Sequence, residues 1–341
     1  MKTLTSKHLI LFAAIILSSC ATPRMFTTLD LLRPAEVTFE PGVKNVLVVN
    51  NSVVQPNNKK QKSANDKNSG TLTFDSTALF CNASLRESLE AKEFFNTVKM
   101  APNSQNTTDN YNKISPLDKK KVKALCDLYD VDALISLDHI QANDETSKYY
   151  EDYTIMNALD IKVNTIWSIH YPNNTATTHK QFTDEFSWEE AKSVDLPKKH
   201  DALVDACILT GSNVAERMIP RWEKQDRYFF TPKKPLMQQA MDSVKTRNWQ
   251  SAISLWKHAL KQSKNFNTKF QASNNIAIAY EILGDIDNAF LYCEQAINYY
   301  PYVMFFYISD SEHIYEILNY YDFLKKRKEE IALISKQLSE K

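Results

Sequence analysis

The sequence predicts a two-part protein, in which a mixed α/β domain of the α+β sandwich type is followed by an all-α domain of helical repeats. Three observations predict this order. Short valine-rich or alternating segments recur between residues 43 and 190, prolines 232 and 235 mark a linker, and only helical periodicity follows the linker. The length of 341 residues also exceeds what one hydrophobic core usually supports.

The first twenty residues have the features of a cleaved leader. Lys2 and Lys7 give it a positive start, and residues 9–17 form an apolar run that is shorter than the roughly 20 residues needed to span a bilayer. The Leu-Ser-Ser-Cys stretch that ends at Cys20 resembles the bacterial lipobox. The resemblance implies that residues 1–19 are a signal peptide and that Cys20 carries acyl chains, which would anchor the protein in a membrane. An ordinary secretory signal with an incidental cysteine is the alternative.

Residues 20–41 then read as a lipidated tether that could hold a short strand, and residues 42–230 as the α/β domain. Helices are favoured where leucines recur at helical spacing or where Ser115 and Pro116 mark a helix start. Residues 55–70 are polar and lysine-rich, which indicates a loop. The expected elements, in order, are a buried strand at 43–50, a helix at 76–92, a strand at 94–98, a helix at 115–129, strands at 131–138, 159–171 and 175–188, and a helix at 200–219.

The strand at 159–171 shows the clearest alternation in the chain. Leu159, Ile161, Val163 and Trp167 fall on one face, which we expect to be packed, while the residues between them should meet water. This order of elements resembles the small α/β domains of bacterial envelope lipoproteins and the amino-terminal module of the Tol-system periplasmic protein. The resemblance implies a mixed sheet covered by helices.

Helical patterns fill residues 231–341. Five residues stand at spacings that resemble the tetratricopeptide repeat: Ala277, Tyr280, Ala289, Ala296 and Pro301. Small alanines let the two helices of a hairpin approach closely, and residues 310–340 would cap the stack with a polar surface. A generic helical bundle is the alternative, because alanine-rich helix contacts also occur there.

Composition excludes several classes of function. The 41 basic and 41 acidic residues balance, so no basic stripe indicates nucleic-acid binding. The four glycines are too scattered for a loop that cradles phosphate or a dinucleotide. No Cys-x-x-Cys, His-Glu-x-x-His or recognisable Ser/His/Asp motif occurs. We therefore expect no metal, no cofactor and no catalytic residues.

Dispersed cysteines and histidines support that expectation. Cysteines 81, 126, 207 and 293 lie in apolar helical contexts and should be buried free thiols, with a disulfide as the alternative. His170 and His179 flank a turn and could form a metal pair. We favour surface-facing strand residues instead, because no third ligand stands at a suitable spacing.

Two hypotheses about function remain. The favoured one is a non-enzymatic envelope lipoprotein that binds a protein partner through its repeats, since tetratricopeptide stacks present a concave groove. Six residues would form that groove: Met237, Met241, Lys245, Asn274, Ile278 and Glu281. The rival is a carbohydrate-active or peptidoglycan-directed protein that uses aromatics such as Trp167, Trp188 or Tyr150 as sugar platforms. Its carboxylates would come from Asp144-Glu145 and Glu151-Asp152, which we expect in a solvated loop.

The whole chain resembles an uncharacterised family of bacterial envelope lipoproteins. No aspartate follows Cys20, which in sorted lipoproteins implies transfer to the outer membrane, and the absence of an acidic run favours a periplasm-facing orientation. Exposure on the cell surface is the alternative.

Overall fold

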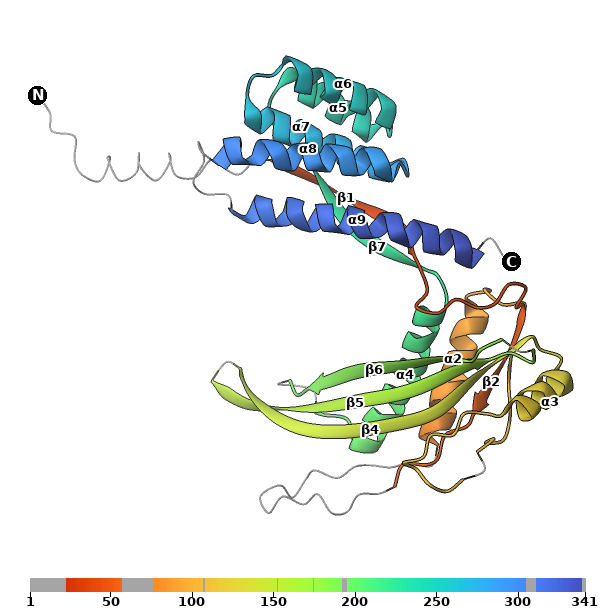
Figure 1. Ribbon diagram of the computed structural model, residues 1–341. Helices are drawn as coiled ribbons and strands as arrows, with labels where there is room; N and C mark the ends of the chain where they lie inside the picture. Colours follow the sequence, from red (N-terminus) through yellow and green to blue (C-terminus); the bar gives the residue numbers. More distant parts are fainter. Residues whose placement is uncertain are drawn as a thin grey trace, which may run out of the picture. The chain divides into compact units, whose positions relative to one another are not determined.

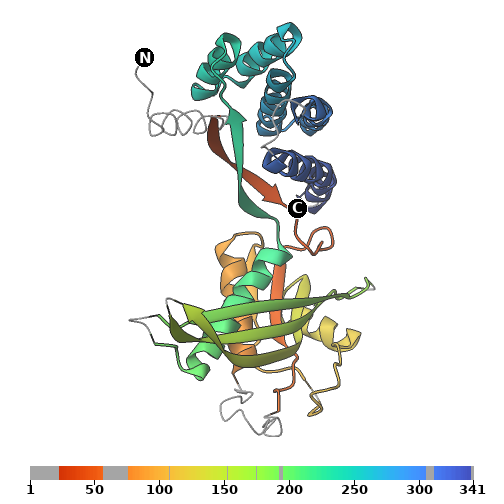
Figure 2. The same ribbon diagram turned by 90° about the vertical axis from the view of Figure 1, so that its left-hand side faces the viewer.

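The computed structural model describes residues 23–56, 76–106, 108–151, 153–173, 175–191, 195–304 and 311–338, which fall into two compact units (Figures 1 and 2). The α/β unit comprises Pro34–Arg221 and Lys336–Lys341, and the helical unit comprises Met1–Arg33 and Trp222–Ser335. The expected layout of an α/β region followed by a helical region is confirmed. The expected signal peptide, residues 1–19, and Cys20 lie outside the described residues. No helix in the described ranges is long and apolar enough to cross a membrane.

The α/β unit is built on a five-stranded sheet with the order β3-β2-β4-β5-β6. Strands β3 and β4 both run parallel to β2, whereas β5 runs antiparallel to β4 and to β6. The elements are β2 (Asn45–Asn50), α2 (Thr77–Ala91), β3 (Thr97–Met100), α3 (Lys119–Tyr129), β4 (Ala133–Glu151), β5 (Thr154–His170), β6 (Thr178–Glu189) and α4 (Lys199–Met218).

Helices cover the two faces of this sheet unequally. Helices α2 and α4 pack side by side on one face, over the main apolar core, while α3 covers a smaller cluster on the other (Figure 1). Gly211 permits the close approach of α2 and α4, because a Cβ atom there would lie 2.2 Å from the backbone oxygen of Cys81. The four cysteines within the described ranges are buried and free, as expected.

Strand β4 corrects one expectation. Asp144 and Glu145 do not lie in a solvated loop, because β4 continues to Glu151 and pairs with β5 along that length. The long alternating strand β5 needs a partner for its backbone groups, and Ile140 and Ala142 of β4 bury their side chains in the same core. The sequence pattern did not indicate this part of β4, because the residues on its other face are polar.

The helical unit combines five helices with a two-stranded sheet. Neighbouring helices from α5 to α8 pack against one another in sequence order. The elements are β1 (Arg24–Arg33), β7 (Arg221–Phe230), α5 (Pro235–Lys245), α6 (Trp249–Gln262), α7 (Phe266–Ile282), α8 (Ile286–Met304) and α9 (Ser311–Leu338). Asn248 and Asn265 cap α6 and α7 through their side chains.

The segments expected to be a tether and the end of the α/β domain form this sheet instead. Strand β1 occupies residues 24–33 and pairs with β7, and Thr231 N donates to Pro23 O over 2.8 Å at one end of the pair. Phe229 and Phe230 of β7 are fully buried in the core of the helices. The two compact units meet at residues 221 and 222, whereas the sequence pattern placed the boundary at residues 230 and 231.

Trp167 on β5 offers a test of the α/β core. Its side chain is fully buried, so Trp167→Ala should lower the free energy of unfolding by about 3–5 kcal/mol through the cavity that it leaves. Lys162 on the opposite face is largely exposed, and Lys162→Ala should change stability by less than about 1 kcal/mol. Denaturant unfolding followed by circular dichroism measures both, and equal losses would show that the assignment of faces is wrong.

Candidate functional site

Helix α7 holds the backbone of β7 through one asparagine. Asn275 Nδ2 donates to Phe230 O, and Phe230 N donates to Asn275 Oδ1, each over 2.8 Å. The side-chain amide thus satisfies a strand residue as a neighbouring strand would, and both partners are buried. This face of α7 therefore contacts the extended backbone of β7.

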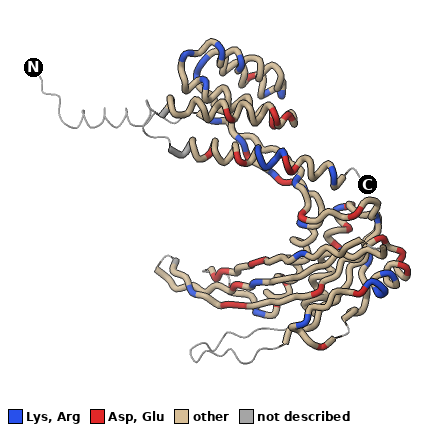
Figure 3. The backbone as a smooth tube through the Cα atoms, in the orientation of Figure 1, with Lys and Arg blue, Asp and Glu red and all other residues tan. Residues whose placement is uncertain are grey.

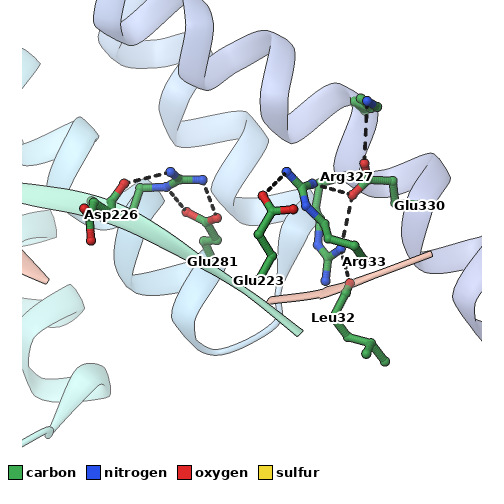
Figure 4. A network of polar contacts seen from close by, with 9 residues as sticks. Leu32, Arg33, Glu223, Asp226, Glu281, Arg327 and Glu330 are labelled. Carbon is green, nitrogen blue, oxygen red and sulfur yellow. Dashed lines mark hydrogen bonds and ion pairs between the residues drawn. The ribbon is translucent and has the colours of Figure 1, made fainter. Parts of the chain in front are cut away.

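A buried ion pair fixes the same strand three residues earlier. Arg227 donates to both carboxylate oxygens of Glu281, over 2.8 and 2.9 Å, and the Glu281 side chain has no exposed surface (Figure 4). Tyr320 of α9 donates its hydroxyl proton to Glu281 over 2.8 Å, and burial raises the pKa of Tyr320 well above its ordinary value. The Arg227 guanidinium also lies 4.4 Å from the ring centre of Phe323. Strand β7 is thereby joined to both α7 and α9.

Strand β1 is attached to α9 by a second set of charged groups. Arg33 donates to Glu330 over 2.7 Å and to Glu223 of β7 over 3.2 Å, and Arg327 donates to Leu32 O over 2.6 Å (Figure 4). At the other end of β1, Arg24 donates to Glu316 over 3.1 Å. The two-stranded sheet is therefore an integral part of the helical unit.

A cavity of about 320 Å³ lies between β7, α7 and α9. This volume is at the lower end of the range for small-ligand sites and could hold one large side chain. Its lining is mixed, with Ile278, Ile317 and Phe323 among the apolar residues and Glu316 and Asn319 among the polar ones.

Asn274 gives this cavity its clearest chemical feature. The residue lines the cavity and is only 4% exposed, yet its Nδ2 atom has no hydrogen-bond partner. A buried donor without a partner costs about 1–3 kcal/mol, so an acceptor atom that entered the cavity would be favoured.

The structure separates the six residues expected to form the groove. Asn274 and Ile278 line the cavity, and Glu281 lies beside it in the ion pair with Arg227. Met237 and Met241 of α5 are buried in the helical core and have no surface for a partner. Lys245 is exposed and pairs with Asp242. Sequence analysis missed Asn275 and Arg227, because the occupant of the α7 face is a distant strand of the same chain.

The α/β unit contains a second polar cluster that sequence analysis also missed. Asp138 is 4% exposed and accepts hydrogen bonds from Asn51 Nδ2 over 2.8 Å, from Ser136 Oγ over 2.9 Å and from Ser168 Oγ. The pairing of β4 with β5 shifts register here, between Leu137 and His139. The cluster lies just past the carboxyl end of β2, where the parallel pairing of β2 with β4 ends at Asn50 and Leu137, and such strand ends are a usual place for sites in α/β folds.

Two histidines extend this cluster. His170 Nε2 lies 3.0 Å from Ser136 Oγ, and His179 Nδ1 lies 2.7 Å from Ser168 Oγ. When each serine gives its one proton to Asp138, each histidine nitrogen donates to its serine. In a nucleophilic triad the histidine accepts the serine proton, whereas here the histidine donates a proton to the serine.

The expectation that His170 and His179 both face the surface is corrected for His170, which is 2% exposed. Its two ring nitrogens lie 3.0 Å from Ser136 Oγ and 3.2 Å from Thr177 Oγ1, so the residue belongs to the buried polar cluster. No group of three or more His, Cys, Asp or Glu in the described part of the chain could hold a metal ion. The sequence contained one signal for this cluster. Two polar residues, Ser168 and His170, alternate with apolar residues at the end of the strand.

An open cavity of about 560 Å³ on strands β4 to β6 contains two of the four acids expected for the rival function, Asp144 and Glu145, but neither Glu151 nor Asp152 is among its described lining. Asp144, Glu145, Asp160 and Glu185 line it, and Phe186 is the aromatic residue among its lining. Lys199 pairs with Asp144 and Lys162 pairs with Glu185, each over 2.6 Å. Trp167, one of the expected sugar platforms, is fully buried elsewhere in the core.

The adjacent residues Asn274 and Asn275 provide a matched pair of variants. Asn275→Ala should lower the free energy of unfolding by about 2–4 kcal/mol, because two buried backbone groups of Phe230 lose their partners. Asn274→Ala removes a donor that has no partner and should leave stability nearly unchanged. Thermal or denaturant unfolding of the two variants distinguishes them, and a larger loss for Asn274→Ala would contradict these roles.

His170 should make the α/β unit sensitive to acid. Burial lowers the pKa of His170, so the folded state disfavours a proton that the unfolded chain accepts near pH 6.5. Its contribution to stability is present above that pH and is lost as the pH falls. The free energy of unfolding should therefore decrease from pH 7 to pH 5, and His170→Gln should reduce this decrease. His200→Gln, at an exposed site, should retain the full dependence.

Comparison with known families covers both units. Residues 43–230 match the family described as domain of unknown function (DUF8603), a range that includes the elements from β2 to β7. Residues 238–326 match the family described as domain of unknown function (DUF6340), from α5 into α9. A search of curated proteins found no match to this chain. Since the first match spans more than half of the 341 residues, the chain belongs to the family described as domain of unknown function (DUF8603).

Proposed function

We propose that this protein is a lipid-anchored bacterial envelope lipoprotein that binds a protein partner, without catalysis, through its helical unit. The binding site is the cavity between β7, α7 and α9. The observation that carries this proposal is the buried Asn274 amide, which lines the cavity and has no partner.

The neighbouring asparagine indicates the kind of ligand. Asn275 holds an extended backbone against α7, so Asn274 on the same helix can donate to a peptide carbonyl in a similar way. Ile278, Ile317 and Phe323 would surround an apolar side chain of that peptide. The partner therefore offers an extended segment with an apolar side chain beside a carbonyl that accepts from Asn274.

The location of this function follows from the leader. Cys20, if acylated, would place the protein in the outer membrane, and the residues after it favour the periplasmic side. The helices of tetratricopeptide-like form would then present the cavity to a soluble or membrane-bound partner in the envelope.

The acid-lined cavity of the α/β unit supports a second candidate, a carbohydrate-active or peptidoglycan-directed protein. Two of its four acids are held by lysines, and Phe186 alone among its lining could stack on a sugar ring. Partner binding is favoured because the Asn274 cavity contains an unsatisfied buried donor.

Site-specific photocrosslinking in cells tests the partner site. A benzophenone amino acid at Asn319, which is exposed and lines the cavity, should yield a discrete protein adduct. The same group at Leu291, exposed on α8, should not. In the protein that carries the benzophenone at position 319, the additional substitution Asn274→Ala should reduce the yield of the adduct about tenfold. This factor corresponds to the loss of one buried hydrogen bond. Equal adducts at both positions, or an adduct indifferent to Asn274, would contradict the proposal.

A further inference from the structure

The end of the helical unit at which β1 begins carries a cluster of exposed aromatic residues. Phe266, the first residue of α7, stacks on Tyr302 near the end of α8, with ring centres 4.6 Å apart. Phe266 is 37% exposed and Tyr302 is 55% exposed. Large aromatics are costly to expose to water without a partner, and exposed clusters of this kind mark contact surfaces.

Lysines surround these rings. Lys269 Nζ lies 5.6 Å from the ring centre of Phe266, and Lys234 Nζ donates to Thr268 Oγ1 in the same turn of α7. Lys261 and Lys264 are exposed at the end of α6 and in the loop that follows. Figure 3 shows Lys and Arg in blue along this part of the helical unit.

No acidic residue offsets this charge locally in the sequence. Between Asp242 and Glu281 the chain contains six basic residues and no aspartate or glutamate. The end of α8, from residue 295 to residue 304, also has no acid. The aromatic rings therefore lie within a region of positive potential that attracts an anionic surface.

Contacts connect this cluster to the start of β1. Thr231 N donates to Pro23 O over 2.8 Å, and Lys234 follows three residues later and contacts α7 at Thr268. The ring of Phe230 lies 5.4 Å from that of Phe270, one turn after Phe266. Pro23 thus lies at the same end of the helical unit as the exposed rings.

The proposed lipid attachment restricts how far this end can be from a membrane. Cys20 precedes Pro23 by three residues, which span at most about 10 Å when fully extended. The polar headgroup layer on one side of a bilayer is about 5–7 Å thick. An acylated Cys20 would therefore hold Pro23 next to the headgroups.

We propose that the surface formed by Phe266, Tyr302, Lys234, Lys261, Lys264 and Lys269, here named the anchor-end patch, binds the headgroups of anionic phospholipids. This inference rests on the lipid anchor of the proposed function and adds a second, noncovalent membrane contact. Tyrosine and phenylalanine rings insert at the level of the headgroups, and lysines pair with lipid phosphates. The helical unit is then the membrane-proximal unit.

Vesicle sedimentation tests the anchor-end patch without the lipid anchor. The probe is the mature chain, residues 20–341 with Cys20→Ser, mixed with phosphatidylcholine vesicles that do or do not contain phosphatidylglycerol. Binding should require phosphatidylglycerol and weaken with salt. Lys261→Glu with Lys264→Glu should weaken apparent binding at least about tenfold, since each lysine near the surface contributes about 1 kcal/mol.

A matched variant controls for net charge. Lys245→Glu with Lys325→Glu makes the same change at exposed positions outside the anchor-end patch and should alter binding less than about twofold. Circular dichroism confirms that both double variants fold. Equal loss in the two variants, or equal binding to both kinds of vesicle, would overturn the proposal.

Palmitate labelling in cells separates this inference from the anchor on which it rests. Label should be incorporated into the natural chain and be absent from Cys20→Ala. Label without vesicle binding would overturn the anchor-end patch and leave the anchor supported. Vesicle binding without label would overturn the anchor and support the patch as the membrane contact.

Discussion

The ion pair between Arg227 and Glu281 is the interaction on which the helical unit depends. It joins β7 to α7, it orients Tyr320 of α9 through the same carboxylate, and it is almost entirely excluded from water. A buried ion pair adds little net stability compared with apolar packing, but removing one partner leaves a buried charge that costs about 3–5 kcal/mol. Its contribution is therefore to specificity: only one register of β7 along α7 satisfies the pair and the amide of Asn275 together.

This constraint also explains the cavity. Strand β7 is held to α7 by Arg227 and Asn275, so Asn274 and Ile278, on the adjacent part of the helix, remain beside an unfilled space. A strand of the same chain therefore occupies part of the α7 face and leaves the rest open. An incoming peptide segment would lie alongside β7 and would not need to displace it.

Local patterns in the sequence predicted the α/β and helical regions well, and predicted the paired tertiary contacts poorly. The alternation from Leu159 to Trp167 correctly identified the packed face of β5, because a half-buried strand records its faces in every second residue. The same rule failed at Ser168 and His170, which are buried on the second face within the polar cluster around Asp138. Met237 and Met241 were expected in a groove, but the concave face of a repeat cannot be assigned from one helix when another segment of the chain fills it. A short strand was considered within residues 20–41, but its pairing could not be predicted, since its partner β7 is almost two hundred residues away.

That separation has a consequence for how the protein is made. Residues 34–221 of the α/β unit separate β1 from the rest of the helical unit, so β1, which is synthesised first, cannot pair with β7 until this long segment has followed it. The ion pair between Arg33 and Glu330 forms later still, because Glu330 lies near the end of the chain. Closing so large a loop adds only a modest entropic cost, but it delays pairing and leaves the edge of β1 unprotected until β7 arrives. Biogenesis of this protein should thus proceed with the inserted unit folding first and the flanking unit closing last, and the interval between them is when the chain is most exposed to aggregation or to chaperone capture.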